Sequence, residues 1–197
     1  MLGRDVVGAF ARVRGDAAAV TGPGGLAGAL FVASPEPASI YNMEFGYATA
    51  TSLGIALAVP GRRAVAIEGD GSMIAEASVF ATIARYRPPN LVVIVVDNGL
   101  YGTGAATIET ATSTGADIAA IARACGLPAD AVLTPATPDE LDRDLGVAMS
   151  EPGPWVIVVK VEMDAAAASE RRPRPGLDFV EASLRFQAAF RRSAGPA

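Results

Sequence analysis

The stretch Asn90–Gly99 reads NLVVIVVDNG, and its residues 91–96 are all aliphatic. A strand with one face in water alternates apolar and polar residues, whereas an unbroken β-branched run is typical of a strand covered on both faces. Further apolar runs lie within residues 16–22, 64–68 and 154–163. Because strands buried on both faces belong to sheets with helices on either side, these runs predict a parallel sheet.

Segments with helical spacing alternate with these runs, at residues 4–15, 46–61, 73–86 and 116–126. A further helix is expected after Thr137, a predicted N-cap with Pro138 at the first helical position. The alternation predicts a doubly wound α/β domain, a parallel sheet with helices on both faces, over residues 1–170.

Two segments break the alternation. Residues 100–115 are rich in Gly and Thr and are expected to form a polar loop. Residues 171–197 are expected to form a basic linker and a C-terminal helix that packs on the domain or on a partner. The apolar positions of that helix are Phe179, Leu184 and Phe186.

Composition excludes several classes of function. The net charge of −5, without a basic stripe, argues against nucleic acid or an anionic membrane as a partner. Histidine is absent, and the single cysteine, Cys125, excludes an internal disulfide, a four-thiolate zinc site and a cysteine-ligated iron–sulfur cluster within this chain. We expect Cys125 to be a small apolar helix residue. With no leader pattern and no apolar run of membrane-spanning length, a cytoplasmic location is expected.

Two of the predicted strands end in polar residues. Residues 64–68 lead into Gly69-Asp70-Gly71-Ser72, and residues 91–96 lead into Asp97-Asn98-Gly99. One helix joins these strands, so Asp70 and Asn98 are expected at the same edge of the sheet, where ligands of α/β folds collect.

Carboxylate, amide and carbonyl oxygens suit Mg²⁺, which fills its remaining positions with phosphate and water. The flanking Gly69 and Gly71 allow close approach of a phosphate, and the Ser72 hydroxyl and the N–H groups of the following helix face the same anion. Either motif alone is most often a turn. Their joint placement predicts a magnesium–phosphate site.

The pattern GDGSM…DNGLYG resembles the thiamine diphosphate motif, in which an Asn follows G-D-G some 25–30 residues later. The stretch EFGYATATSLGIALAVPGRRAVAIEGDG is similar to the segment before that motif in thiamine diphosphate-dependent decarboxylases and acetolactate synthases. The parts DNGLYGTG, ADIAAIARACG and RPRPGLDFVEASLRFQAAF most resemble the β subunit of sulfopyruvate decarboxylase and the matching half of phosphonopyruvate decarboxylase. The resemblance extends from about Gly15 onward.

The resemblance implies a diphosphate-binding domain that holds thiamine diphosphate through Mg²⁺. Its metal ligands match Asp70, Asn98 and the carbonyl of Leu100. Its cofactor contacts match Gly69, Gly71 and Ser72, with Phe45 near the aminopyrimidine and with Tyr101, Gly102 and Thr103 in a covering loop. Core packing for Phe45, and a solvated loop for Tyr101 and Thr103, are the alternatives.

The family also needs a pyrimidine-binding domain, whose glutamate helps to activate the cofactor. This chain has room only for the diphosphate domain, so we expect a hetero-oligomer in which the partner supplies that glutamate. No certain catalytic residue lies in this chain, and Glu44 is on the wrong domain. The implied activity is non-oxidative decarboxylation of a 2-oxo acid, a lyase reaction that releases carbon dioxide and an aldehyde.

Residues 98–122 contain no Lys or Arg, so either the partner provides the cation for a sulfonate or phosphonate, or the substrate carries neither group. A carboligase of the acetolactate synthase kind and a non-catalytic binding subunit are alternatives. An oxidoreductase subunit is disfavoured because one cysteine cannot hold an iron–sulfur cluster. A dinucleotide-binding domain is disfavoured because residues 22–25, GPGG, lack the G-x-G-x-x-G spacing.

Overall fold

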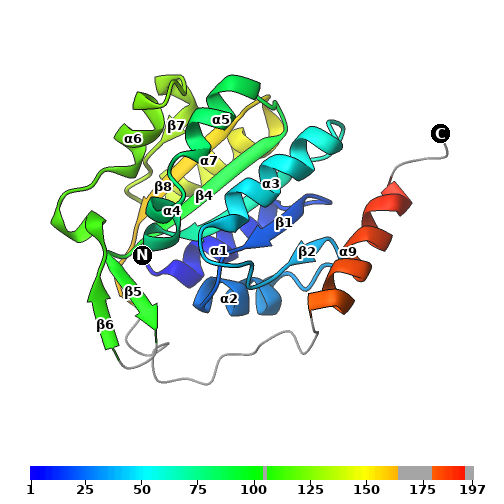
Figure 1. The fold of residues 1–197 in the computed structure, drawn as a ribbon, viewed down its shortest axis with the longest axis horizontal. Helices are drawn as coiled ribbons and strands as arrows, with labels where there is room; N and C mark the ends of the chain where they lie inside the picture. The colour runs from blue at the N-terminus through cyan, green and yellow to red at the C-terminus, as the bar shows by residue number, and fades with distance from the viewer. Residues whose placement is uncertain (104–105, 164–178, 194–197) are drawn as a thin grey trace.

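A six-stranded sheet lies at the centre of the structure (Figure 1), a computed structural model that describes residues 1–103, 106–163 and 179–193. The strand order is β2-β1-β3-β4-β8-β7, and each neighbouring pair is parallel, as the apolar runs predict. The strands are β1 Ala18–Thr21, β2 Ser39–Ile40, β3 Ala64–Gly69, β4 Leu91–Asp97, β7 Val132–Leu133 and β8 Trp155–Lys160.

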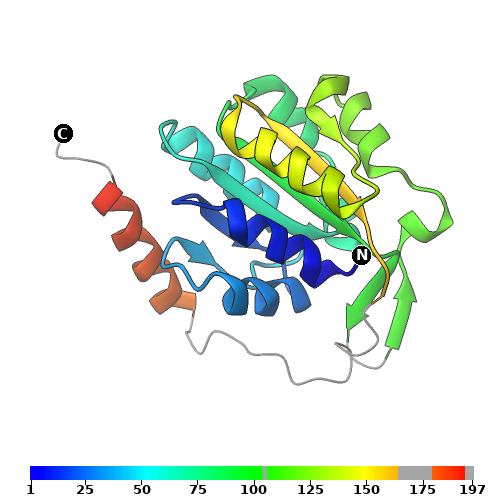
Figure 2. The same ribbon diagram turned by 180° about the vertical axis from the view of Figure 1, so that it is seen from behind.

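Helices cover both faces of the sheet, which confirms the doubly wound architecture. One face carries α3 Tyr47–Ala58, α4 Asp70–Ala75, α5 Val79–Tyr86 and α6 Ile118–Ala124. The other face, seen from behind in Figure 2, carries α1 Gly3–Val13, α2 Gly25–Ala33 and α7 Pro138–Ser150. Helix α7 begins as its sequence predicts, because Thr137 caps the backbone N–H of Glu140 in a capping box and Pro138 is the first helical residue.

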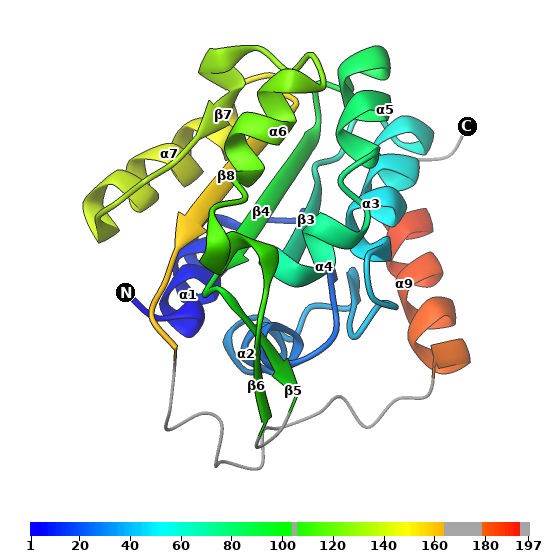
Figure 3. The same ribbon diagram turned by 60° about the vertical axis from the view of Figure 1, so that its left-hand side comes forward.

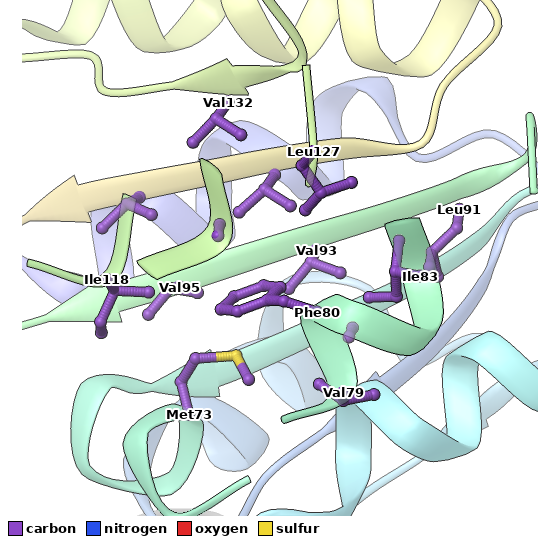
Figure 4. Packing of buried hydrophobic residues seen from close by; sticks show 14 of the residues in the cluster. Met73, Val79, Phe80, Ile83, Leu91, Val93, Val95, Ile118, Leu127 and Val132 are labelled. Atoms are coloured by element: carbon purple, nitrogen blue, oxygen red, sulfur yellow. The ribbon is translucent and has the colours of Figure 1, made fainter. Parts of the chain in front are cut away.

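Strand β4 packs into two hydrophobic layers at once. Val93 and Val95 contact the layer under α3, α5 and α6, while Val92 and Ile94 contact the layer under α1 and α7. Figure 4 shows the first layer, where the ring of Phe80 lies against β4. Phe80 is completely buried, and its truncation to alanine would cost about 3–5 kcal/mol. The aliphatic run is unbroken because β4 packs into a hydrophobic core on each face of the sheet.

The connections and the edge strands differ from the prediction in four places. The helix expected at residues 73–86 begins at Asp70 and divides into α4 and α5. The expected polar loop at 100–115 contains a two-stranded hairpin, β5 Leu100–Thr103 and β6 Ala106–Glu109, and a 3₁₀ turn, η1 Ala111–Thr114. A second 3₁₀ turn, η2 Ala129–Ala131, precedes β7. The edge strands β2 and β7 have two residues each, which is too short for any residue pattern.

The C-terminal helix is α9, Phe179–Ser193, beside β2 (Figure 1). Phe186 packs with Ile40 and Ala48, whereas Leu184 is 60% exposed. Packing of this helix against a partner stays a prediction. The predicted linker and its boundary at residue 170 lie outside the described residues. Within the described part of the chain, none of the helices has both the length and the apolar character needed to cross a bilayer.

Candidate functional site

The carboxyl ends of β3 and β4 lie side by side, because Gly69 pairs with Val96 in the parallel register. Strand β1 leads through α2 to the sheet edge at β2, and β3 leads through α4 and α5 in the opposite direction to β4. The point between β1 and β3 is therefore a topological switch point, where α/β folds bind ligands. Figure 3 shows α4 at this edge, with the β5–β6 hairpin extending beyond it.

Asp70 is the first residue of α4, and its carboxylate is buried, with the residue 1% exposed. Its Oδ2 atom accepts hydrogen bonds from the hydroxyls of Thr110 and Thr112, the latter at 2.8 Å. Both threonines are buried and come from the segment that follows the β5–β6 hairpin. Among the described residues, no Lys or Arg forms an ion pair with Asp70.

Asp97 lies at the end of β4 and is also buried. Its Oδ1 lies 2.9 Å from the same Thr112 hydroxyl, so this threonine lies between two carboxylates and its one proton can serve only one of them. Its Oδ2 is 2.6 Å from the Lys160 ammonium, whose side chain is 67% exposed. Asp97 therefore has a positive partner, whereas Asp70 has only hydroxyl groups.

Asn98 follows Asp97, and its Oδ1 accepts the backbone N–H of Leu100 at 3.0 Å, an Asx turn that shapes the start of β5. A carboxamide oxygen has two lone pairs, so this bond leaves one for another ligand. Asn98, Leu100 and Thr112 line a hollow of about 350 Å³ at this edge of the sheet, together with Lys160. A hollow of about 470 Å³ lies at the opposite edge, beside Arg62 and α9, away from all of these groups.

Aromatic rings cover the start of α4. The Tyr101 ring lies so close to Gly71 that a Cβ atom there would be 2.2 Å from its Cε1 atom. The Phe45 ring, from the segment before α3, lies 6.0 Å from the Tyr101 ring between centroids. Gly46, next to Phe45, has a φ of +86° that favours glycine, and its N–H donates to the Ser72 hydroxyl at 2.8 Å. The structure thus joins the Phe45 segment to α4 through Ser72.

Glu68, two residues before Asp70, is a buried acid that the sequence did not single out. Its Oε1 accepts the backbone N–H of Thr49 at 3.1 Å, in the first turn of α3, and its Oε2 has no hydrogen-bond partner among the described residues. Burial is the main cause that raises the pKa of Glu68, and the backbone hydrogen bonds at Thr49 and Ala48 oppose it.

The structure brings several predicted residues to one edge of the sheet: Phe45, Gly69, Asp70, Gly71, Ser72, Asn98, Leu100 and Tyr101. Gly102 and Thr103 belong to β5, but the Thr103 side chain lies outside what is described. Thr112 connects Asp70 to Asp97 rather than to Asn98. The roles of the predicted residues as ligands of a metal or cofactor stay predictions.

Sequence reasoning missed Glu68, Asp97, Thr110, Thr112 and Lys160. For Asp97 a signal existed, because an acid that directly follows six aliphatic strand residues must lie at the sheet edge. For the threonines none existed, since their contact with Asp70 spans about 40 residues and depends on the hairpin between them.

Comparisons with known proteins support the fold and give the family. The family model described as thiamine pyrophosphate enzyme, C-terminal TPP binding domain, matches residues 27–159. Phosphonopyruvate decarboxylase from Streptomyces viridochromogenes is 30% identical over 88% of this chain and 42% of its own length. Sulfopyruvate decarboxylase subunit beta from Methanococcus maripaludis is 30% identical over 76% of this chain and 75% of its own length. The chain spans less than half of the two phosphonopyruvate decarboxylases it matches.

Solved structures give the same result. A Mycobacterium smegmatis protein assigned as a thiamin diphosphate-dependent enzyme superposes with a TM-score of 0.71 at 28% identity, over 83% of this chain and 32% of that one. The 4-hydroxybenzoylformate decarboxylase of Rhodococcus jostii RHA1 has a TM-score of 0.66 at 18% identity, over 83% of this chain and 33% of that one, which supports the fold. The chain therefore belongs to the thiamine pyrophosphate enzyme family and comprises its C-terminal, cofactor-binding domain.

Proposed function

We propose that this chain is the diphosphate-binding subunit of a two-subunit enzyme that decarboxylates a 2-oxo acid of the sulfopyruvate or phosphonopyruvate kind. The relatives that it matches over most of their length are named as subunits of such an enzyme, which supports the arrangement. The observation that carries the proposal is the Asp70 carboxylate, which is buried at the switch point without a positive partner among the described residues.

The two threonine hydroxyl groups have too few protons to donate a hydrogen bond in every contact with Asp70 and Asp97. Two threonine hydroxyl protons serve four contacts, namely Thr110 and Thr112 with Asp70, Thr112 with Asp97, and the two threonines with each other. Each hydroxyl donates one hydrogen bond, so two of these contacts lack a proton of their own. A buried carboxylate in this position is costly unless a cation neutralises it. A divalent metal ion at Asp70 would supply that charge.

The oxygen donors present fit magnesium. Asp70, the Asn98 side-chain oxygen and the Leu100 carbonyl would hold the ion, with phosphate and water in the remaining positions. Among the described residues, His, Cys, Asp and Glu form no group of three or more that could bind a metal, so a site made only from such side chains is not the alternative. Thiamine diphosphate, when bound, supplies the electron sink for breaking a carbon–carbon bond next to a ketone.

The other residues at this edge position the cofactor and exclude water. Ser72 holds Gly46 and so sets the distance between the Phe45 segment and α4. The rings of Phe45 and Tyr101 shield the space above Gly71, and the Tyr101 ring must turn aside for a diphosphate to reach the backbone there. We propose that Tyr101 then closes over the bound diphosphate.

Helix α3 offers a surface for the partner subunit. It contains no charged residue from Tyr47 to Ala58, yet Tyr47 is 56% exposed and Leu57 is 44% exposed. A helix that is apolar all round is normally buried. Because this face begins beside Phe45, at the candidate site, we propose that the pyrimidine-binding chain covers it and completes the active site.

The partner also has to supply positive charge for a second acid group on the substrate. Lys160 lines the same hollow as Asn98, but its ammonium is paired with Asp97. We therefore propose that the cation for a sulfonate or phosphonate comes from the partner, as does the glutamate that activates the cofactor. The location of this enzyme in the cytoplasm stays a prediction.

Calorimetric titration with thiamine diphosphate and Mg²⁺, with and without the partner chain, tests the cofactor site. Asp70→Ala is expected to weaken metal-dependent binding by more than 100-fold, while the exposed Asp130→Ala on η2 is a control that leaves it unchanged. Binding to Asp70→Ala at wild-type affinity would contradict the site. No heat from either ligand with wild-type protein would favour a non-catalytic subunit.

Two measurements test the reaction and the partner. With the partner present, release of carbon dioxide and an aldehyde from sulfopyruvate or phosphonopyruvate supports the decarboxylase, whereas a longer product formed only with an added acceptor aldehyde indicates a carboligase. Leu57→Glu on α3 is expected to weaken association with the partner at least tenfold in sedimentation. Val147→Glu, on the charged helix α7, is the matched control and is expected to change nothing.

A further inference from the structure

Two threonine hydroxyls bind one oxygen of Asp70 and leave the other free. Thr110 and Thr112 both contact Oδ2, and Oδ1 accepts no hydrogen bond from the described residues. The buried side-chain oxygens and nitrogens that lack a partner are those of Ser52, Glu68 and Asn90, and Asp70 Oδ1 is not among them. Oδ1 therefore keeps slight contact with solvent, although Asp70 as a whole is only 1% exposed, while Oδ2 faces the threonines.

The two hydroxyls are themselves held in place. Thr112 has one hydroxyl proton, and because Asp97 is already bound by the Lys160 ammonium and the Gly99 backbone N–H, that proton is available to Asp70. Thr110 is fixed by its own backbone, whose N–H donates to the Gly99 carbonyl at 2.9 Å. The orientation of Asp70 is thus set by the loop that follows β4 and by Lys160 at the end of β8.

This orientation selects among metal ions. A carboxylate with one oxygen occupied can bind a cation only through the other, which suits the six-ligand geometry of Mg²⁺. Calcium accepts more ligands and often takes both oxygens of one carboxylate. We propose that Thr110 and Thr112 are specificity-determining residues that keep Asp70 monodentate and so favour Mg²⁺ over Ca²⁺. The proposal rests on the metal site of the proposed function and adds the cause of its preference.

The test compares the affinities for Mg²⁺ and Ca²⁺, titrated separately into the complex of this chain with its partner at saturating thiamine diphosphate. Thr110→Val and Thr112→Val each keep the side-chain volume and remove one hydroxyl from Oδ2. Each is expected to shift the affinity ratio toward Ca²⁺ by about tenfold. Thr114→Val is the matched control in the same 3₁₀ turn, because the Thr114 hydroxyl contacts only the Ala111 carbonyl. Thr112→Ser, which restores the hydroxyl, is expected to keep the wild-type ratio.

The ratio of the two affinities separates this role from a purely structural one. If the threonines were only structural, their loss would weaken the binding of Mg²⁺ and Ca²⁺ equally. A wild-type ratio in both valine variants would overturn the inference and leave the metal site intact. Failure of wild-type protein to bind either metal would overturn the proposed function and this inference with it. If Thr112→Val does not fold, the ratio in Thr110→Val decides.

Discussion

The sheet has an amino edge, where its parallel strands begin, and a carboxyl edge, where they end. These two edges hold buried charge in opposite ways. At the amino edge, Arg14 is 2% exposed and all three of its guanidinium nitrogens donate hydrogen bonds. The acceptors are the carbonyls of Ala17, Ser34 and Ala38 and the hydroxyls of Ser34 and Ser39. At the carboxyl edge, Asp70 has no positive partner and Glu68 has one oxygen without any partner, among the described residues.

We infer that this difference separates a structural charge at Arg14 from a charge at Asp70 that binds a ligand. The hydrogen bonds of Arg14 tie the ends of α1 and α2 to the starts of β1 and β2, so the site is complete within the chain. The acids at the carboxyl edge are less well satisfied by protein groups, which is costly in the absence of a ligand. A ligand-binding site is expected where buried charged groups lack partners within the protein.

The largest effect on stability is expected at the complete site. Arg14→Met leaves several buried carbonyl and hydroxyl groups without donors, at about 1–3 kcal/mol for each group that finds no new partner. We expect the free energy of unfolding in urea to fall by about 3 kcal/mol or more, with cofactor affinity unchanged in the folded fraction. A loss below about 1 kcal/mol would show that Arg14 is not the structural counterpart of Asp70.

Most of the fold could be predicted because burial leaves a pattern in the sequence. The runs at β3, β4 and β8 and the cap at Thr137 each reflect a local need. The division of α4 from α5 could not be predicted, since Met73 on one piece and Phe80 on the other both keep their core positions across the break. The hairpin after β4 could not be predicted either, because its Gly and Thr residues are equally typical of a loop.

The candidate site was predictable only in its first members. Asp70 and Asn98 follow buried strands, so local sequence places them at the sheet edge. The groups that complete the cluster come from η1 and from β8, and only the tertiary structure brings them to Asp70 and Asp97. A sequence shows where a charge is placed, but not which groups neutralise it.

A smaller effect, dependent on pH, is expected at Glu68. Burial raises its pKa above the ordinary value of 4.5, so between these two values the folded state holds the proton and the unfolded state does not. The free energy of unfolding therefore falls as pH rises from about 4.5 through the folded pKa. Glu68→Gln keeps the acceptor for Thr49 and removes the ionisation. We expect the variant to gain stability relative to wild type as pH rises, measured by urea unfolding between pH 4 and 8. A difference in the free energy of unfolding between variant and wild type that stays constant across that range would show that ionisation of Glu68 does not destabilise the fold.

We propose that the Asp70 carboxylate is buried in order to bind a cation, and the unfolding of Asp70→Asn in denaturant is the sharpest check. Without ligands, we predict that the variant is at least as stable as wild type, because it loses an unneutralised buried charge and keeps its shape. With thiamine diphosphate and Mg²⁺ at about 100 times their dissociation constants, wild type should gain about 2.7 kcal/mol and the variant nothing. A variant that is several kcal/mol less stable without ligands, or that gains as much as wild type with them, would show that Asp70 does not bind a cation.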